Sequence, residues 1–206
     1  MKNKKVKIGA VATAVALSVT TAVGVGAAVS AQESIGTPNT ALAASSTPVA
    51  DVVEENGFQF DKSTGTITDY TGNETGTLTI PSSIDGVTVT SIKSYALGSS
   101  KMKEVVIPNT IETLGFGVFQ MCSSLEKVTF ESGSKVTELK DSMFYQCTKL
   151  KEVVFPENLK SIKVLAFYKC TGLETVTLPE GFTTLYNAAF LDCTKLKTVI
   201  VPDSLN

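Results

Sequence analysis

The stretch LETVTLPEGFTTLYNAAFLDCTK, residues 173–195, determines how the rest of the chain is interpreted. It holds an opening leucine, a β-branched run that a proline ends, and a phenylalanine three residues before a cysteine. That last pair occurs four times, as Phe119–Cys122, Phe144–Cys147, Phe167–Cys170 and Phe190–Cys193. Successive cysteines lie 25, 23 and 23 residues apart, and repeats of this length predict a solenoid.

Each unit opens with the pattern L-x-x-V-x-(apolar)-P, in which alternate residues are apolar, as in a strand with one buried face. Stacked units would align these strands into a parallel sheet on one face, with short helical or irregular turns on the other. The charges support this register, because lysine and glutamate alternate from unit to unit, which favours cross-strand attraction. At the second position of the units the residues are Lys103, Glu126, Lys151, Glu174 and Lys197, and at the third they are Glu104, Lys127, Glu152, Thr175 and Thr198.

We expect the middle of each unit to fill the core, with the four phenylalanines stacked as a spine and each cysteine a small buried residue behind it. The expected core residues are Ile111, Leu114, Val136, Leu139, Leu159, Ile162, Phe182 and Leu185. The cysteine spacing matches no zinc-chelating pair, so we expect no metal site. Disulfides between neighbouring coils are an alternative, because coils about 5 Å apart satisfy the Cα separation.

Four regions follow from the N-terminus. Residues 1–31 read as a signal peptide, with four early lysines, an uncharged run and small residues before Ala31; the alternatives are cleavage after Ala43 or an uncleaved membrane anchor. We expect a flexible linker over 32–56, a small β-hairpin cap over 57–76, and a repeat array over 77–206. The array has about five and a half units, and the truncated last one would leave an uncapped edge suited to self-association.

Composition excludes several kinds of chemistry. The sequence has no His, no Arg and no Trp, so histidine-dependent nucleophilic catalysis and imidazole metal sites are closed, and bidentate reading of phosphate or guanine is missing. We therefore expect no enzymatic activity, no catalytic residue, no cofactor and no nucleic-acid partner.

The units "FPENLKSIKVLAFYKCTGL", "LPEGFTTLYNAAFLDCTKL" and "IPNTIETLGFGVFQMCSSL" resemble the BspA-like leucine-rich repeats of bacterial cell-surface and secreted proteins. The resemblance covers residues 77–206. It implies an exported module for adhesion or protein binding, with a protein or glycan on host or microbial surfaces as its partner and no retained membrane span.

The expected contact face is the exposed side of the sheet. It comprises the stripe Val106, Thr129, Val154, Thr177 and Ile200 with the charged residues Lys103, Glu126, Lys151 and Glu174. A second row, Gln120, Tyr145, Tyr168 and Leu191, is another candidate. Two further hypotheses remain: a targeting or substrate-binding module of a longer exported enzyme, and a structural surface protein that assembles through its open edge.

Overall fold

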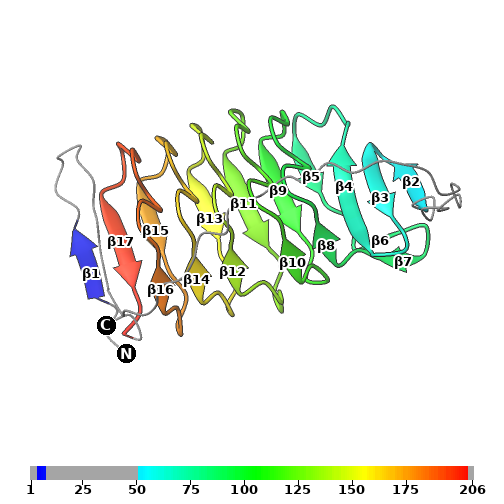
Figure 1. Ribbon diagram of the computed structural model, residues 1–206. Coiled ribbons are helices and arrows are strands. Elements are labelled where there is room, and N and C mark those ends of the chain that lie inside the picture. Colours follow the sequence, from blue (N-terminus) through cyan, green and yellow to red (C-terminus); the bar gives the residue numbers. More distant parts are fainter. Residues whose placement is uncertain (1–3, 8–50, 204–206) are drawn as a thin grey trace, which may run out of the picture.

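The computed structural model describes residues 4–7 and 51–203, and most of this part winds as the coils of a solenoid (Figure 1). Every coil begins with a short strand of the main row, which is β5 (Thr77–Thr79), β9 (Glu104–Ile107), β11 (Lys127–Phe130), β13 (Glu152–Val154), β15 (Thr175–Thr177) and β17 (Thr198–Val201). Pairing within the row is parallel, and Lys127 lies in register with both Glu104 and Glu152. The predicted parallel sheet and its charge register are confirmed.

Each coil also contributes a two-residue strand to a second row, which the sequence analysis did not anticipate. The row consists of β8 (Ser91–Ile92), β10 (Thr113–Leu114), β12 (Glu138–Leu139), β14 (Ser161–Ile162) and β16 (Thr184–Leu185). These strands also pair in parallel. Turns connect the two rows, and the described residues contain no helix, so the expected short helical turns are absent there.

Neither row is continuous. The main row divides into one sheet of β5, β9, β11 and β13 and another of β15, β17 and β1, although β13 and β15 remain neighbours. The second row divides between β10 and β12. That division falls in the coil that contains ESGSK, residues 131–135, where the repeat is two residues longer.

An antiparallel sheet of three strands covers the first coil. It is formed by β2 (Val52–Glu55), β3 (Phe58–Asp61) and β4 (Thr66–Tyr70), and β4 continues in parallel to β8. The strand β2 lies inside the range assigned to the linker, so ordered structure begins before the expected boundary. The overlooked signal was Asn56-Gly57, where both residues have positive φ as a two-residue hairpin turn requires. A second hairpin, β6 (Ser83–Ile84) with β7 (Val87–Thr88), uses Asp85-Gly86 in the same way.

The opposite end of the solenoid is also covered. Strand β1 (Lys4–Lys7) pairs antiparallel with β17, from Lys4 opposite Val201 to Lys7 opposite Thr198 (Figure 1). The expectation of an uncapped edge at β17 is therefore wrong for this chain as described. An exposed strand edge leaves N–H and C=O groups unpaired, and β1 supplies partners for them.

Buried side chains from all coils form one core cluster along the solenoid. Of the expected core residues all are buried except Leu185, which is half-buried. The spine rings stack with centroid separations of 5.5 Å for Phe119–Phe144, 5.1 Å for Phe144–Phe167 and 5.0 Å for Phe167–Phe190. Stacked aromatic pairs of this kind add to the free energy gained by burial.

Every coil turns through the left-handed backbone region twice, at the positions five residues and one residue before the cysteine. The first position holds Tyr95, Gly117, Ser142, Leu165 and Ala188, and the second holds Ser99, Met121, Gln146, Lys169 and Asp192, where Ser100 stands for the cysteine of the first coil. Left-handed backbone costs a residue with a side chain about 1 kcal/mol. The inter-coil contacts thus impose a conformation that these residue types do not favour.

Candidate binding surface

The main row presents a stripe of β-branched side chains on its outer side. Thr79, Val106, Thr129 and Val154 lie in register across four strands, and Thr177 pairs with Ile200 beyond the division of the row. The alternate residues of the same strands, such as Val105, Val128 and Val176, are buried. Val154 is the most accessible valine of the stripe, with 41% of its surface exposed.

Ion pairs between coils flank this stripe. The Nζ atoms lie 2.6 Å from the carboxylate in Lys151–Glu126, 3.2 Å in Lys127–Glu152 and 3.1 Å in Lys197–Glu174. The side-chain hydrogen bond from Lys151 lowers the pKa of Glu126, so its carboxylate stays charged. Each of these exposed pairs contributes little to stability, and their regular arrangement makes the border of the stripe electrostatically balanced.

A hollow of about 520 Å³ opens beside the stripe, where the main-row strands of three coils begin. Its walls come from Glu126, Thr148, Lys149, Lys151, Gly172, Glu174 and Lys195. Three of these residues belong to the expected contact face, whereas the other four were not singled out in the sequence. The clue was Gly172, which occupies the repeat position of Lys149 and Lys195 and has no side chain to fill it.

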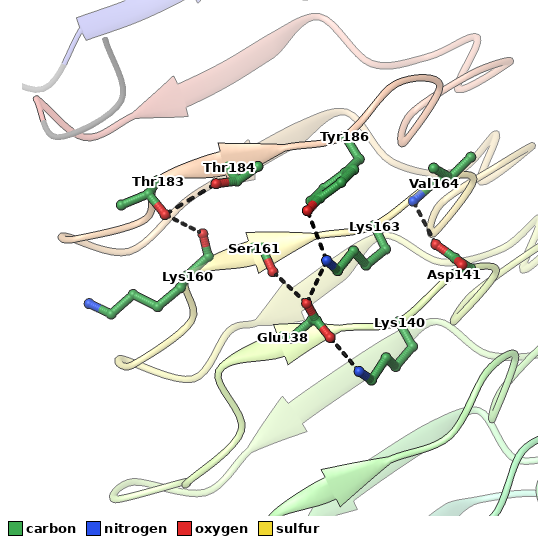
Figure 2. A network of polar contacts seen from close by, with 10 residues as sticks. All are labelled: Glu138, Lys140, Asp141, Lys160, Ser161, Lys163, Val164, Thr183, Thr184 and Tyr186. Carbon is green, nitrogen blue, oxygen red and sulfur yellow. Dashed lines mark hydrogen bonds and ion pairs between the residues drawn. The ribbon is translucent and has the colours of Figure 1, made fainter. Parts of the chain in front are cut away.

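The second row carries a polar network on a different part of the surface (Figure 2). The carboxylate of Glu138 pairs with the ammonium groups of Lys140 and Lys163, the latter at 2.8 Å, and accepts a hydrogen bond from Ser161 at 3.1 Å. Lys163 also donates to the hydroxyl of Tyr186 at 2.9 Å. Partial burial alone would raise the pKa of Glu138, but hydrogen bonds from Lys140, Lys163 and Ser161 outweigh it and lower the pKa to about 2. Because charge and hydrogen bonds are satisfied within it, the network joins coils and offers no free chemical group.

The second candidate row is closed on itself at its centre. The rings of Tyr145 and Tyr168 lie 4.8 Å apart, and the ammonium of Lys169 lies 5.1 Å from the centre of the Tyr168 ring. Both tyrosines are half-buried, as are Gln120 and Leu191. The row therefore presents edges of side chains to solvent, in contrast to the projecting side chains of the main row.

All four cysteines are free and buried, so no disulfide joins the coils. Each thiol donates to a carbonyl of the preceding coil: Cys122 to Leu97, Cys147 to Phe119, Cys170 to Phe144 and Cys193 to Phe167, at Sγ–O distances of 3.0–3.2 Å. Burial raises the pKa of Cys193 to about 12, and it also raises the pKa of Cys170. These thiols stay protonated and act as hydrogen-bond donors between coils.

Two searches of the described residues bear on metals and membranes. Residues 4–7 and 51–203 contain no cluster of three or more His, Cys, Asp or Glu side chains that could hold a metal ion. In the same ranges the structure has no helix with the length and apolar character needed to cross a bilayer.

Comparison with known proteins places this architecture among bacterial repeat proteins. A leucine rich cell surface protein from Faecalibacterium prausnitzii has a solved structure that is 30% identical, with a TM-score of 0.62 over 75% of this chain and 43% of that chain. A leucine-rich repeat protein from T. pallidum is 29% identical, with a TM-score of 0.59 over 64% of this chain and 60% of that chain. One from Bacteroides ovatus is 30% identical, with a TM-score of 0.57 over 75% of this chain and 39% of that chain.

The chain thus spans less than two thirds of the length of each of these structures. No curated protein matches its sequence. The family of the BspA type leucine rich repeat region matches residues 90–206 in six copies, which is more than half of the chain. With the repeat units, the stacked spine and the solved structures in agreement, the protein belongs to the BspA-type leucine-rich repeat family.

Proposed function

We propose that the protein is a non-enzymatic binding module, exported to the cell surface or the medium, that holds a protein partner on the exposed side of its main row. The observation that supports this most is the in-register stripe of Val106, Thr129 and Val154, which projects β-branched side chains between ion-paired borders. An apolar centre with a polar rim is the usual anatomy of a protein interface.

Export rests on the three-part pattern of residues 1–31 and on the family, whose member from Faecalibacterium prausnitzii is described as a cell surface protein. The intact mass of the protein from culture medium and from the cell envelope tests this part of the proposal. We expect a chain that begins after Ala31 or Ala43. A chain of full mass that stays inside the cell would contradict export.

The binding surface is tested by a matched pair of variants. Val154 in the main row and Val164 in the turns beyond β14 are similarly exposed, at 41% and 39%. We expect Val154→Lys to reduce binding of the fluorescently labelled protein to bacterial or epithelial cells at least tenfold, because it places an unpaired charge in the centre of an interface. Val164→Lys should leave binding unchanged.

Flow cytometry measures the binding, and circular dichroism checks that both variants fold. Protease treatment of the cells separates a protein partner, whose binding is lost, from a glycan, whose binding persists. Equal binding by Val154→Lys and Val164→Lys would contradict the proposed surface.

A further inference from the structure

The hollow beside the main row contains two lysines whose charges the solenoid does not neutralise. Among its charged residues, Lys151 pairs with Glu126, and Glu174 pairs with Lys197 just outside the rim. Lys149 and Lys195 are exposed, and within residues 4–7 and 51–203 neither makes a salt bridge. The hollow therefore has an excess positive charge at these two positions.

Gly172 keeps the space between the two lysines open. Lys149, Gly172 and Lys195 occupy the same repeat position in consecutive coils, two residues after each cysteine. A Cβ atom on Gly172 would lie 2.7 Å from the carbonyl oxygen of Leu150 and 2.9 Å from the carbonyl carbon of Lys149. The backbones of the two coils are too close for any side chain there, so the gap is a consequence of the packing.

One anion can reach both ammonium groups. Coils two apart in a parallel stack are separated by roughly 10 Å, and each lysine has a flexible four-carbon stem. A carboxylate placed over Gly172 would thus be within reach of Lys149 and Lys195 at once. The remaining lining, Thr148 and the ion-paired residues, is polar and does not compete for this position.

The surroundings favour an isolated carboxylate on a peptide. Glu126 and Glu174 line the same hollow and would repel a ligand with closely spaced negative charges, such as a nucleic acid or a sulfated glycan. No aromatic ring lines the hollow to stack on a sugar. The adjacent stripe, with Val154 and Thr177 exposed, suits the apolar and β-branched side chains of an extended peptide.

We propose that this hollow binds a glutamate or aspartate side chain of an extended peptide segment, which it anchors beside the main row. The inference rests on the proposed function, since the segment would belong to the protein partner held by the stripe. It adds the chemistry of that partner: acidic side chains separated by uncharged residues.

The test uses the intact protein and a defined probe, a short fluorescein-labelled peptide of alternating threonine and glutamate with blocked ends. Fluorescence anisotropy measures its binding. We expect Lys149→Gln and Lys195→Gln each to weaken binding about fivefold, and the double variant about twentyfold, because each lysine supplies one exposed charge contact. The matched control, Lys93→Gln with Lys101→Gln, removes two exposed lysines far from the hollow and should have no effect.

Further outcomes decide the ligand class. The corresponding threonine–glutamine peptide should bind at least tenfold more weakly, and raising the salt from about 0.1 to 0.5 M should weaken binding of the acidic peptide. Equal binding of the two peptides, or equal losses in the Lys149/Lys195 and Lys93/Lys101 variants, would overturn the inference. Binding of an oligomer of uronic acids through Lys149 and Lys195, without binding of the peptide, would overturn it in favour of a glycan.

The two proposals fail separately. If Val154→Lys abolishes cell binding while the Lys149/Lys195 variant binds cells and peptide normally, the binding surface stands and the anchor does not. If the lysine variant alone loses the peptide while Val154→Lys binds cells normally, the anchor stands and the proposed face is wrong.

Discussion

The repeated cysteine is the clearest case in which one residue type has one physical role in every coil. Its thiol is small enough to be buried behind the phenylalanine spine, and it donates to a backbone carbonyl of the coil before it. A buried carbonyl without a partner is costly, so the thiol stabilises both the corner and the stacking of coils. In the first coil Ser100 takes this position, and its hydroxyl donates instead to Leu97 of the same coil.

Replacing a central thiol tests this role. Cys147→Ala removes the 3.0 Å hydrogen bond to the Phe119 carbonyl and leaves a small cavity, and we expect the free energy of unfolding to fall by about 1–2 kcal/mol. Cys147→Ser keeps a donor of nearly the same size and should lose less. Urea denaturation measures both, and an alanine variant as stable as the parent protein would show that the hydrogen bond contributes nothing.

At the scale of the strands, the two rows are held together by different side chains. The main row pairs exposed lysines and glutamates across neighbouring coils, whereas the second row concentrates its charge on Glu138, which contacts two lysines and a serine. The less exposed network is the stronger of the two, because partial burial reduces screening by solvent. It joins β12, β14 and the turn after β16, immediately beyond the division of the second row.

The second row should therefore weaken in acid. The pKa of Glu138 is about 2 in the folded protein and near 4.5 as its ordinary value, so its contribution is complete above pH 4.5 and is lost as the pH falls toward 2. We expect Glu138→Gln to be less stable than the parent protein at pH 6, with a difference that shrinks steadily below pH 4.5.

Urea unfolding at several pH values measures this difference. The control is Glu157→Gln, an exposed glutamate outside the ion pairs that the structure describes. A difference between Glu138→Gln and the parent protein that stays constant with pH would show that the glutamate acts by packing rather than by charge.

At the scale of the whole molecule, the solenoid has a covered edge at each end. The sheet of β2, β3 and β4 covers the first coil, and β1 covers β17. The residues of β1 also lie within the predicted signal peptide. If the leader is cleaved on export as we propose, β17 loses this neighbour, and its unpaired backbone groups become available to a second molecule.

Self-association should therefore depend on β1. In a strand, successive N–H groups point in opposite directions, so Lys5→Pro and Val6→Pro differ in whether the lost N–H faces β17. We expect one of the two substitutions, and deletion of residues 1–31, to give concentration-dependent dimers in sedimentation velocity experiments, while the other substitution has a smaller effect. A monomeric deletion variant at all concentrations would contradict a role for the β17 edge.

Much of this architecture follows from sequence because the repeat makes each inference several times. The alternation of Lys151 with Glu126 and of Lys127 with Glu152 predicts parallel, in-register strands, and the ion pairs form between those residues. The spine and the core residues follow in the same way, since apolar residues at fixed positions in every unit stack on one another. Family membership depends on the same recurring positions.

Other features depend on contacts between coils, which one unit by itself does not encode. The left-handed conformations of Tyr95, Leu165 and Ala188 arise because stacking fixes the backbone whatever the side chain, and the second row is too short to leave an alternating pattern. The hollow at Gly172 exists because two backbones approach within contact distance between longer side chains. The sequence by itself determined the repeat, its register and its core; the packing of neighbouring coils decided the turns, the divisions of the rows and the place where a ligand can enter.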